Sequence, residues 1–133
     1  MDVKANLNTI LKSIPKEVTL VAVSKTRQNS AIIEAYQLGQ RIFGENKVQE
    51  LVQKFEELPK DINWHMIGHL QTNKVKFIAP FVSLIHGVDS IKLLKEINKR
   101  AKQNNRVIDC LLQVHIATES TKFGFDISEV NEA

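Results

Sequence analysis

Lys25 stands directly after a short apolar run, in the stretch LVAVSKTRQ that covers residues 20–28. An exposed lysine is protonated at neutral pH and is therefore not a nucleophile. At the end of an apolar strand, partial burial disfavours the ammonium form, and a neutral amine can attack an aldehyde to form a Schiff base. Lys25 is thus either an ordinary solvated loop residue or an amine that holds an aldehyde cofactor.

Other polar side chains also follow apolar runs that are expected to be strands. They are Glu45 and Asn46 in FGEN, Gly68 and His69 in IGH, His86 and Asp89 in HGVD, and His115 in QVHIATES. In a parallel α/β protein the functional site lies at the carboxyl ends of the strands, so these residues are expected on one face. Taken singly, each could be a helix cap or a turn former. Their convergence indicates a functional site.

The sequence favours Schiff-base chemistry on Lys25 over a metal site or a serine-hydrolase site. All four histidines lie at or near expected strand ends, namely His65, His69, His86 and His115. The sequence has no His-x-His on a strand and no His-Glu-x-x-His on a helix, so we predict no metal site. The Gly-x-Ser-x-Gly signature of serine hydrolases is also missing. The single cysteine, Cys110, lies in an apolar run, which indicates a core thiol and fits a reducing, cytoplasmic compartment.

Helical and strand patterns alternate five times after a leading helix. We expect helices over residues 3–14, 30–38, 48–58 and 75–79, a fifth helix whose apolar stripe covers residues 93–101, and strands over residues 19–23, 41–43, 64–67, 82–85 and 107–116. Asn29 or Ser30 is the expected N-cap of the second helix, and Asp89 or Ser90 that of the fifth. The segment DISEVNEA indicates the first turn of a further helix. Without hairpin signals between the strands, the pattern predicts a parallel sheet covered by helices.

Two architectures satisfy this pattern, an open doubly wound sheet and a (β/α)₈ barrel. No Gly-x-Gly-x-x-Gly follows a strand, which weakens the case for a dinucleotide-binding sheet. A barrel needs about 250 residues, so a chain of 133 residues would hold little more than half of one.

Composition predicts one soluble globular domain. The chain is 43% hydrophobic and 25% charged, with a net charge of +3. The densest basic run, residues 92–106, has a strong amphipathic pattern, so we interpret it as a solvated helix face and expect no nucleic-acid partner. The polar N-terminus does not resemble a signal peptide, and the longest apolar run is interrupted by Pro80, so no membrane span is expected.

Five motifs, in one order, resemble a known family. VAVSKT, FGENKVQE, WHMIGHLQTNK, HGVDS and LLQVHIATESTKFGF are similar to the YggS/PROSC family of pyridoxal phosphate homeostasis proteins, over residues 18–125. The resemblance implies a (β/α)₈ barrel like the N-terminal domain of alanine racemase. This chain would then be a single domain, with a leading helix in residues 1–15 and about the first five βα units in residues 18–133.

The same resemblance implies the site. Family members carry pyridoxal 5'-phosphate (PLP) as a Schiff base on the lysine of the SK motif, which is Lys25 here. It places Asn46 beside the cofactor, and His65 and Gly68 near its ring. The family commonly has asparagine where this chain has His115, so the role of that residue stays open. The turns that bind the PLP phosphate in the family belong to three further strands that nothing here matches.

We therefore expect a PLP-binding protein without catalytic residues, which stores, delivers or buffers the cofactor. One alternative is a PLP-dependent amino-acid racemase; another is a half-barrel without a ligand. Two-base racemases of this fold place a tyrosine opposite the lysine, and the single tyrosine, Tyr36, is expected in a helix. That favours the binding protein. We expect a full-length form to be a monomer and this chain to associate through open strand edges.

Overall fold

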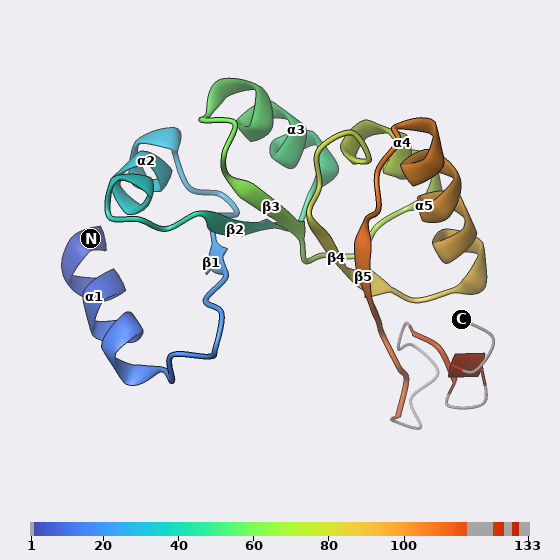
Figure 1. Cartoon of the computed structure of the whole chain (residues 1–133), viewed down its shortest axis with the longest axis horizontal. Helices are drawn as coiled ribbons and strands as arrows, with labels where there is room; N and C mark the ends of the chain where they lie inside the picture. Colours follow the sequence, from blue (N-terminus) through green and yellow to red (C-terminus); the bar gives the residue numbers. More distant parts are fainter. Residues whose placement is uncertain (1, 117–123, 127–128, 131–133) are drawn as a thin grey trace.

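The computed structural model describes residues 2–116, 124–126 and 129–130, and its centre is a parallel five-stranded sheet. The strands are β1 (Ala22–Val23), β2 (Ile42–Glu45), β3 (Asn63–Met66), β4 (Leu84–Val88) and β5 (Asp109–Leu112). They lie side by side in chain order, and every neighbouring pair is parallel. A doubly wound sheet reverses its strand order at a switch point. The unreversed order and the curved arc of strands in Figure 1 favour the barrel architecture.

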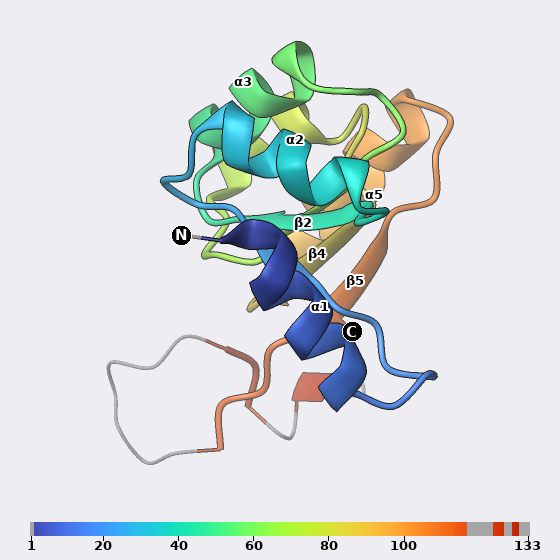
Figure 2. The ribbon, with the colours of Figure 1, turned by 90° about the vertical axis from the view of Figure 1, so that its left-hand side faces the viewer.

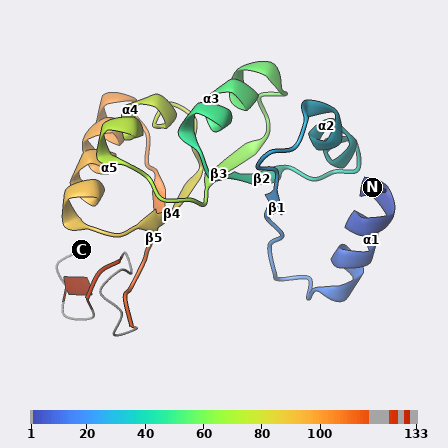
Figure 3. The same cartoon turned by 180° about the vertical axis from the view of Figure 1, so that it is seen from behind.

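Helices cover one side of this arc. They are α1 (Val3–Ser13), α2 (Asn29–Gln37), α3 (Val48–Glu57), the short η1 (Thr72–Lys74), α4 (Val75–Ile78) and α5 (Ile91–Gln103). Figures 1 and 2 show α2 to α5 on the outer side of the strands, while α1 lies next to α2 at the β1 end. Among the described helices, none lies on the opposite, concave side of the sheet, as the view from behind in Figure 3 also shows.

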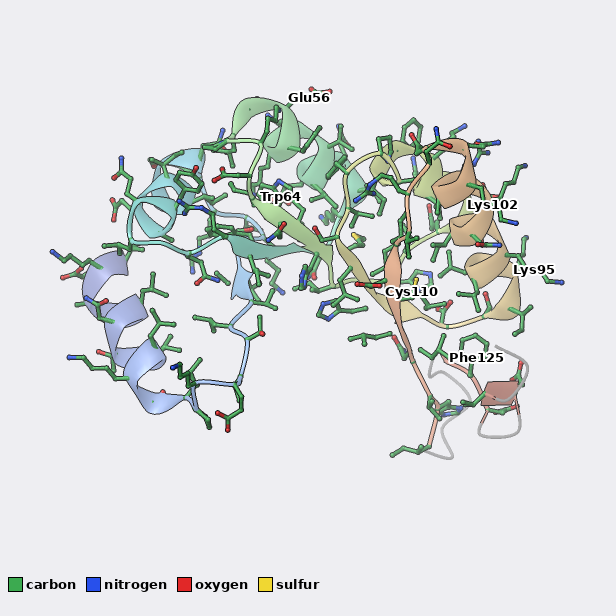
Figure 4. The ribbon with its side chains drawn as sticks, in the orientation of Figure 1. Glu56, Trp64, Lys95, Lys102, Cys110 and Phe125 are labelled. Atoms are coloured by element: carbon green, nitrogen blue, oxygen red, sulfur yellow. The ribbon has the colours of Figure 1, made fainter. Side chains whose placement is uncertain are left out.

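The hydrophobic core fills the space between the strands and the outer helices. Its strand residues include Phe43, Trp64, Met66, Ile85 and Val88, all buried. The rings of Phe43 and Trp64, which are paired across β2 and β3, have centroids 5.9 Å apart, and Figure 4 labels Trp64. Because side chains alternate along a strand, the residues between these core positions point to the concave side.

The basic run and the cysteine lie near β5. Leu93, Ile97 and Ala101 form the buried stripe of α5, whereas Lys95 and Lys102 are exposed and point away from the sheet in Figure 4. This is the solvated helix face that the sequence predicts. Cys110 is half-buried against the core, and its burial raises the pKa of the thiol.

Several boundaries differ from the prediction. The N-cap of α2 is Gln28 rather than Asn29 or Ser30, because the Asn29 side chain instead donates a hydrogen bond to Glu57 Oε2 at 2.6 Å. The first strand is paired only at Ala22–Val23, and the last is paired at Asp109–Leu112. Beyond β5, an isolated bridge joins Val114 to Phe125, both among the described residues. Most of the expected C-terminal helical turn lies outside the described residues.

Other predictions are confirmed. Ser90 is the N-cap of α5, and its hydroxyl accepts a hydrogen bond from the Leu93 N–H at 3.1 Å. The leading helix ends at Ser13, before Pro15, and α3 ends at Glu57, before Pro59. In the part of the chain that the structure describes, no helix is both long and apolar enough to span a membrane.

Candidate functional site

Lys25 lies in the turn that follows β1, at the carboxyl end of an edge strand. Its side chain is exposed, and its amine has no hydrogen-bond or ion-pair partner among the described residues. The partial burial predicted from the apolar run is therefore not found. The reason is topological: β1 pairs only with β2, and no described element covers the turn on the concave side. The amine is accessible to a ligand.

The residues on either side of Lys25 are held by a polar network. The Ser24 hydroxyl donates a hydrogen bond to Glu45 Oε2, and the Ser24 carbonyl accepts one from Lys54 Nζ at 2.7 Å. The Thr26 N–H donates to Glu50 Oε1 at 2.6 Å. The hydrogen bond from Lys54 is the main cause that lowers the pKa of Glu50. The turn that carries Lys25 is thus tied to β2 and α3.

Asn46 and Gly68 follow the next two strands, and the structure brings them together. A Cβ atom on Gly68 would lie 2.6 Å from the Asn46 carbonyl oxygen and 2.9 Å from its Cα, so a larger residue would force the two strand ends apart. Asn46 is not the N-cap of α3, because that position is Lys47, which makes no side-chain cap bond. The Asn46 side chain is partly buried and lines a cavity of about 520 Å³.

His65 lies on β3 and faces His86 on β4. Their Nδ1 and Nε2 atoms are 3.1 Å apart, so one ring donates its proton to the other in a hydrogen bond. Burial lowers the pKa of both rings, and for His65 the neighbouring His86 lowers it further. The two imidazoles are therefore neutral at physiological pH, and the pair forms a hydrogen-bonding surface on the concave side.

The remaining predicted residues are the pair His69 and Asp89, and His115. His69 approaches Asp89, with Nδ1 and Oδ2 3.1 Å apart, which links the loops after β3 and β4. His115 lies beyond β5, where its backbone N–H bonds to the Phe125 carbonyl at 2.6 Å. Among the described residues, no group of three or more His, Cys, Asp or Glu side chains could hold a metal ion.

Lys54 and Glu50 are site residues that the sequence analysis missed. Lys54 is buried in the apolar face of α3, between Leu51 and Leu58 at helical spacing. A charged residue in such a stripe is unusual, since lysine is almost never fully buried unless it is paired. That irregularity in the helical pattern was the available signal.

These residues fit an aldehyde cofactor. Lys25 offers an accessible amine on a turn whose flanking residues are fixed, and Asn46 offers an amide at the next strand end. The close approach at Gly68 leaves no room for a side chain between the β2 and β3 ends. The neutral His65 adds a hydrogen-bonding group on the same sheet. These strand ends can bind and orient an aldehyde, and can attach it covalently through the neutral fraction of the lysine amine.

Comparisons with known proteins place the chain in a family. The family model for the alanine racemase N-terminal domain matches residues 2–133. The pyridoxal phosphate homeostasis protein of Aquifex aeolicus (strain VF5) is 45% identical over 114 residues, which are 85% of this chain and 50% of that protein. The protein of the same name from Escherichia coli (strain K12) is 40% identical over 122 residues, 89% of this chain and 52% of that protein. The chain thus spans about half the length of these curated relatives.

Solved structures agree with this relationship. PipY of Synechococcus elongatus PCC7942, solved without PLP, matches with a TM-score of 0.92 at 36% identity, over 98% of this chain and 62% of PipY. The structure of PipY with PLP bound matches with a TM-score of 0.88 at 35% identity, over 98% of this chain and 61% of PipY. The predicted fold class is confirmed: the arc of five strands corresponds to part of the alanine racemase-like barrel of PipY.

Proposed function

Because the chain belongs to the alanine racemase N-terminal domain family, and within it to the pyridoxal phosphate homeostasis proteins, we propose that it binds PLP and takes part in PLP homeostasis. The cofactor would be held as a Schiff base on Lys25. The observation that carries the proposal is the accessible Lys25 amine, which has no partner among the described residues and lies on a turn whose two flanking residues are fixed by hydrogen bonds.

Each residue has a distinct part in this proposal. When bound, PLP supplies an aldehyde for the lysine and an electron-withdrawing ring. Lys25 provides the covalent link, and Asn46 orients the ligand through its amide. Gly68 allows the β2 and β3 ends to approach closely, and His65, neutral through burial and through its His86 neighbour, offers a hydrogen bond near the ring. No proton transfer is assigned to any of them.

The racemase alternative receives no support from Tyr36. The Tyr36 hydroxyl donates a hydrogen bond to Asp61 Oδ1 at 2.6 Å, and the Arg41 guanidinium lies 3.7 Å from the centre of its ring. Tyr36 is on α2, on the outer side of the sheet, so it does not face Lys25 across the strand ends. Racemization needs a second base at that place, and this chain has no other tyrosine.

The test is covalent trapping. The purified chain is incubated with excess PLP, reduced with borohydride and digested for peptide mapping. We expect a visible absorbance band before reduction and the label on Lys25 after it. Lys25→Ala should remove both without unfolding the chain, because the side chain is exposed. Lys47→Ala, which removes another exposed lysine near Asn46, should retain them. A label on a different lysine would refute the proposal.

A further inference from the structure

Glu45 and Lys54 form an ion pair inside the molecule. Lys54 Nζ lies 2.8 Å from Glu45 Oε2, and the two side chains are 6% and 0% exposed. Withdrawing two charges from water costs several kcal/mol per ion, and buried pairs can often be replaced by apolar residues without loss of stability. Stability alone therefore does not explain a charged pair between β2 and α3.

The contacts of the Lys54 ammonium group point to a local task. Its three donors match three acceptors: the Ser24 carbonyl at 2.7 Å, Glu45 Oε2 at 2.8 Å and Glu50 Oε1 at 2.8 Å. Glu45 also accepts a hydrogen bond from the Ser24 hydroxyl. One buried cation thus joins the residue before Lys25 to both β2 and α3.

Glu50 holds the other side of the turn. Its Oε1 accepts the Thr26 N–H at 2.6 Å while it binds Lys54. Thr26 has a φ of +62°, which is rare for a β-branched residue and persists only where surrounding contacts impose it. The conformation of the turn at Ser24, Lys25 and Thr26 is therefore imposed by the network and is not the local preference of these residues.

From these contacts we infer that Lys54, Glu45 and Glu50 are positioning residues that fix the direction in which Lys25 presents its amine to an aldehyde. The inference rests on the proposed function and deepens it. Without the network, Thr26 can relax to negative φ, and the Lys25 amine then samples a wider range of orientations. The network touches the backbone beside Lys25, and no described residue binds the amine itself.

The experiment measures the rate at which borohydride traps PLP on Lys25, by peptide mapping of the full 133-residue chain. Glu50→Ala removes the acceptor of the Thr26 N–H, and the buried Lys54 keeps its ion pair with Glu45. We expect Lys25 labelling to slow by about tenfold, since a hydrogen bond to a charged group is lost. Glu50→Gln keeps an acceptor and should restore most of the rate.

Two further variants separate positioning from folding. The double variant Glu45→Gln/Lys54→Met neutralises the buried pair without leaving one charge alone, and we expect slower labelling of Lys25 in it as well. The control is Arg100→Met, which removes the i,i+4 pair between Arg100 and Glu96 on α5. That pair has the same 2.8 Å separation as the pair between Lys54 and Glu50, and its loss should not change the labelling rate of Lys25. Amide hydrogen exchange gives a second readout: the Thr26 N–H should exchange faster in Glu50→Ala, while core amides of β3 stay protected.

The outcomes are distinguishable from a failure of the proposed function. If the parent chain is labelled on another lysine, the function proposal fails. If the parent is labelled on Lys25 and Glu50→Ala is labelled as fast, the positioning role is wrong. A slowing of equal size in Arg100→Met would also refute it, because general destabilisation would then be the cause.

Discussion

At the scale of residues, the place of Lys25 depends on side chains that are far away in the sequence. Its own side chain has no partner among the described residues, whereas Ser24 and Thr26 are held by Glu45, Glu50 and Lys54. An exposed amine on a fixed turn loses little backbone freedom when it binds a ligand, because that freedom was lost on folding. This arrangement lowers the conformational entropy cost of attaching a ligand at Lys25.

Asn46→Ala should weaken PLP binding while covalent attachment to Lys25 persists. The physical reason is the loss of one or two hydrogen bonds that orient the ligand, about 1–3 kcal/mol. Because Lys47, not Asn46, is the N-cap of α3, the variant should keep nearly the full free energy of unfolding. Equilibrium dialysis with PLP measures the affinity, and Asn73→Ala, at an exposed asparagine of η1, is the control. Unchanged affinity in Asn46→Ala would contradict the orienting role.

The histidine pair predicts a pH dependence of stability. Burial lowers the pKa of His65 and His86 in the folded chain, so below the unfolded value of ~6.5 the unfolded state takes up protons first. Their contribution to stability is complete above that value and is lost as the pH falls. The urea concentration at the unfolding midpoint should therefore be lower at about pH 5.5 than at about pH 7.5. His86→Gln should lose less stability over this interval, and equal losses in both proteins would refute the assignment.

At the scale of elements, the helices differ in whether the side chain of the N-cap residue makes a hydrogen bond. Ser90 caps α5 with its side chain, whereas Gln28 and Lys47, the N-caps of α2 and α3, make no side-chain cap bond. The long α5 packs its buried stripe between solvated lysines and the sheet. The start of α2 was mispredicted because Asn29, a good N-cap by type, uses its amide to reach Glu57 on the neighbouring helix.

Ser90→Ala should destabilise the chain by about 0.5–2 kcal/mol, because the Leu93 N–H loses its only capping acceptor at the start of α5. Chemical denaturation followed by far-UV circular dichroism measures the change. Ser90→Asn, which supplies another side-chain oxygen at the cap, is the matched control and should recover most of the loss. If Ser90→Ala and Ser90→Asn have the same free energy of unfolding, the cap hydrogen bond makes no measurable contribution to stability.

At the scale of the whole molecule, the sheet is an open arc. β1 and β5 each pair with a single neighbour, so both present an unpaired strand edge in the part of the chain that the structure describes. Two apolar side chains lie exposed at these edges, Val23 and Leu111, with about half of their surface in contact with solvent. Open edges next to exposed apolar residues favour pairing between chains.

The 133-residue chain should therefore associate with itself in solution. Light scattering is expected to give a mass above 15.1 kDa that rises with concentration. Leu111→Lys places a charge at the β5 edge and should shift the mass toward the monomer. Lys95→Gln, on the outer face of α5, should leave it unchanged. A monodisperse monomer at all concentrations would refute association through the edges.

The sequence by itself determined the alternation of helices and strands, the parallel sheet and the family. These properties depend on neighbouring residues: apolar spacing along one element, and motifs such as VAVSKT and FGENKVQE that remain together in the chain. Lys25 could be singled out in the same way, because it directly follows an apolar run.

Only the tertiary structure decided how these side chains meet. The strand register sets Gly44 opposite His65 and brings His65 to His86, 21 residues away. It also buries Lys54 beside Glu45 and Ser24, and it leaves Lys25 exposed where the sequence predicted partial burial. Hydrophobic periodicity tells which face of an element is covered, but not which residue of the next element lies opposite, because register depends on contacts between distant segments.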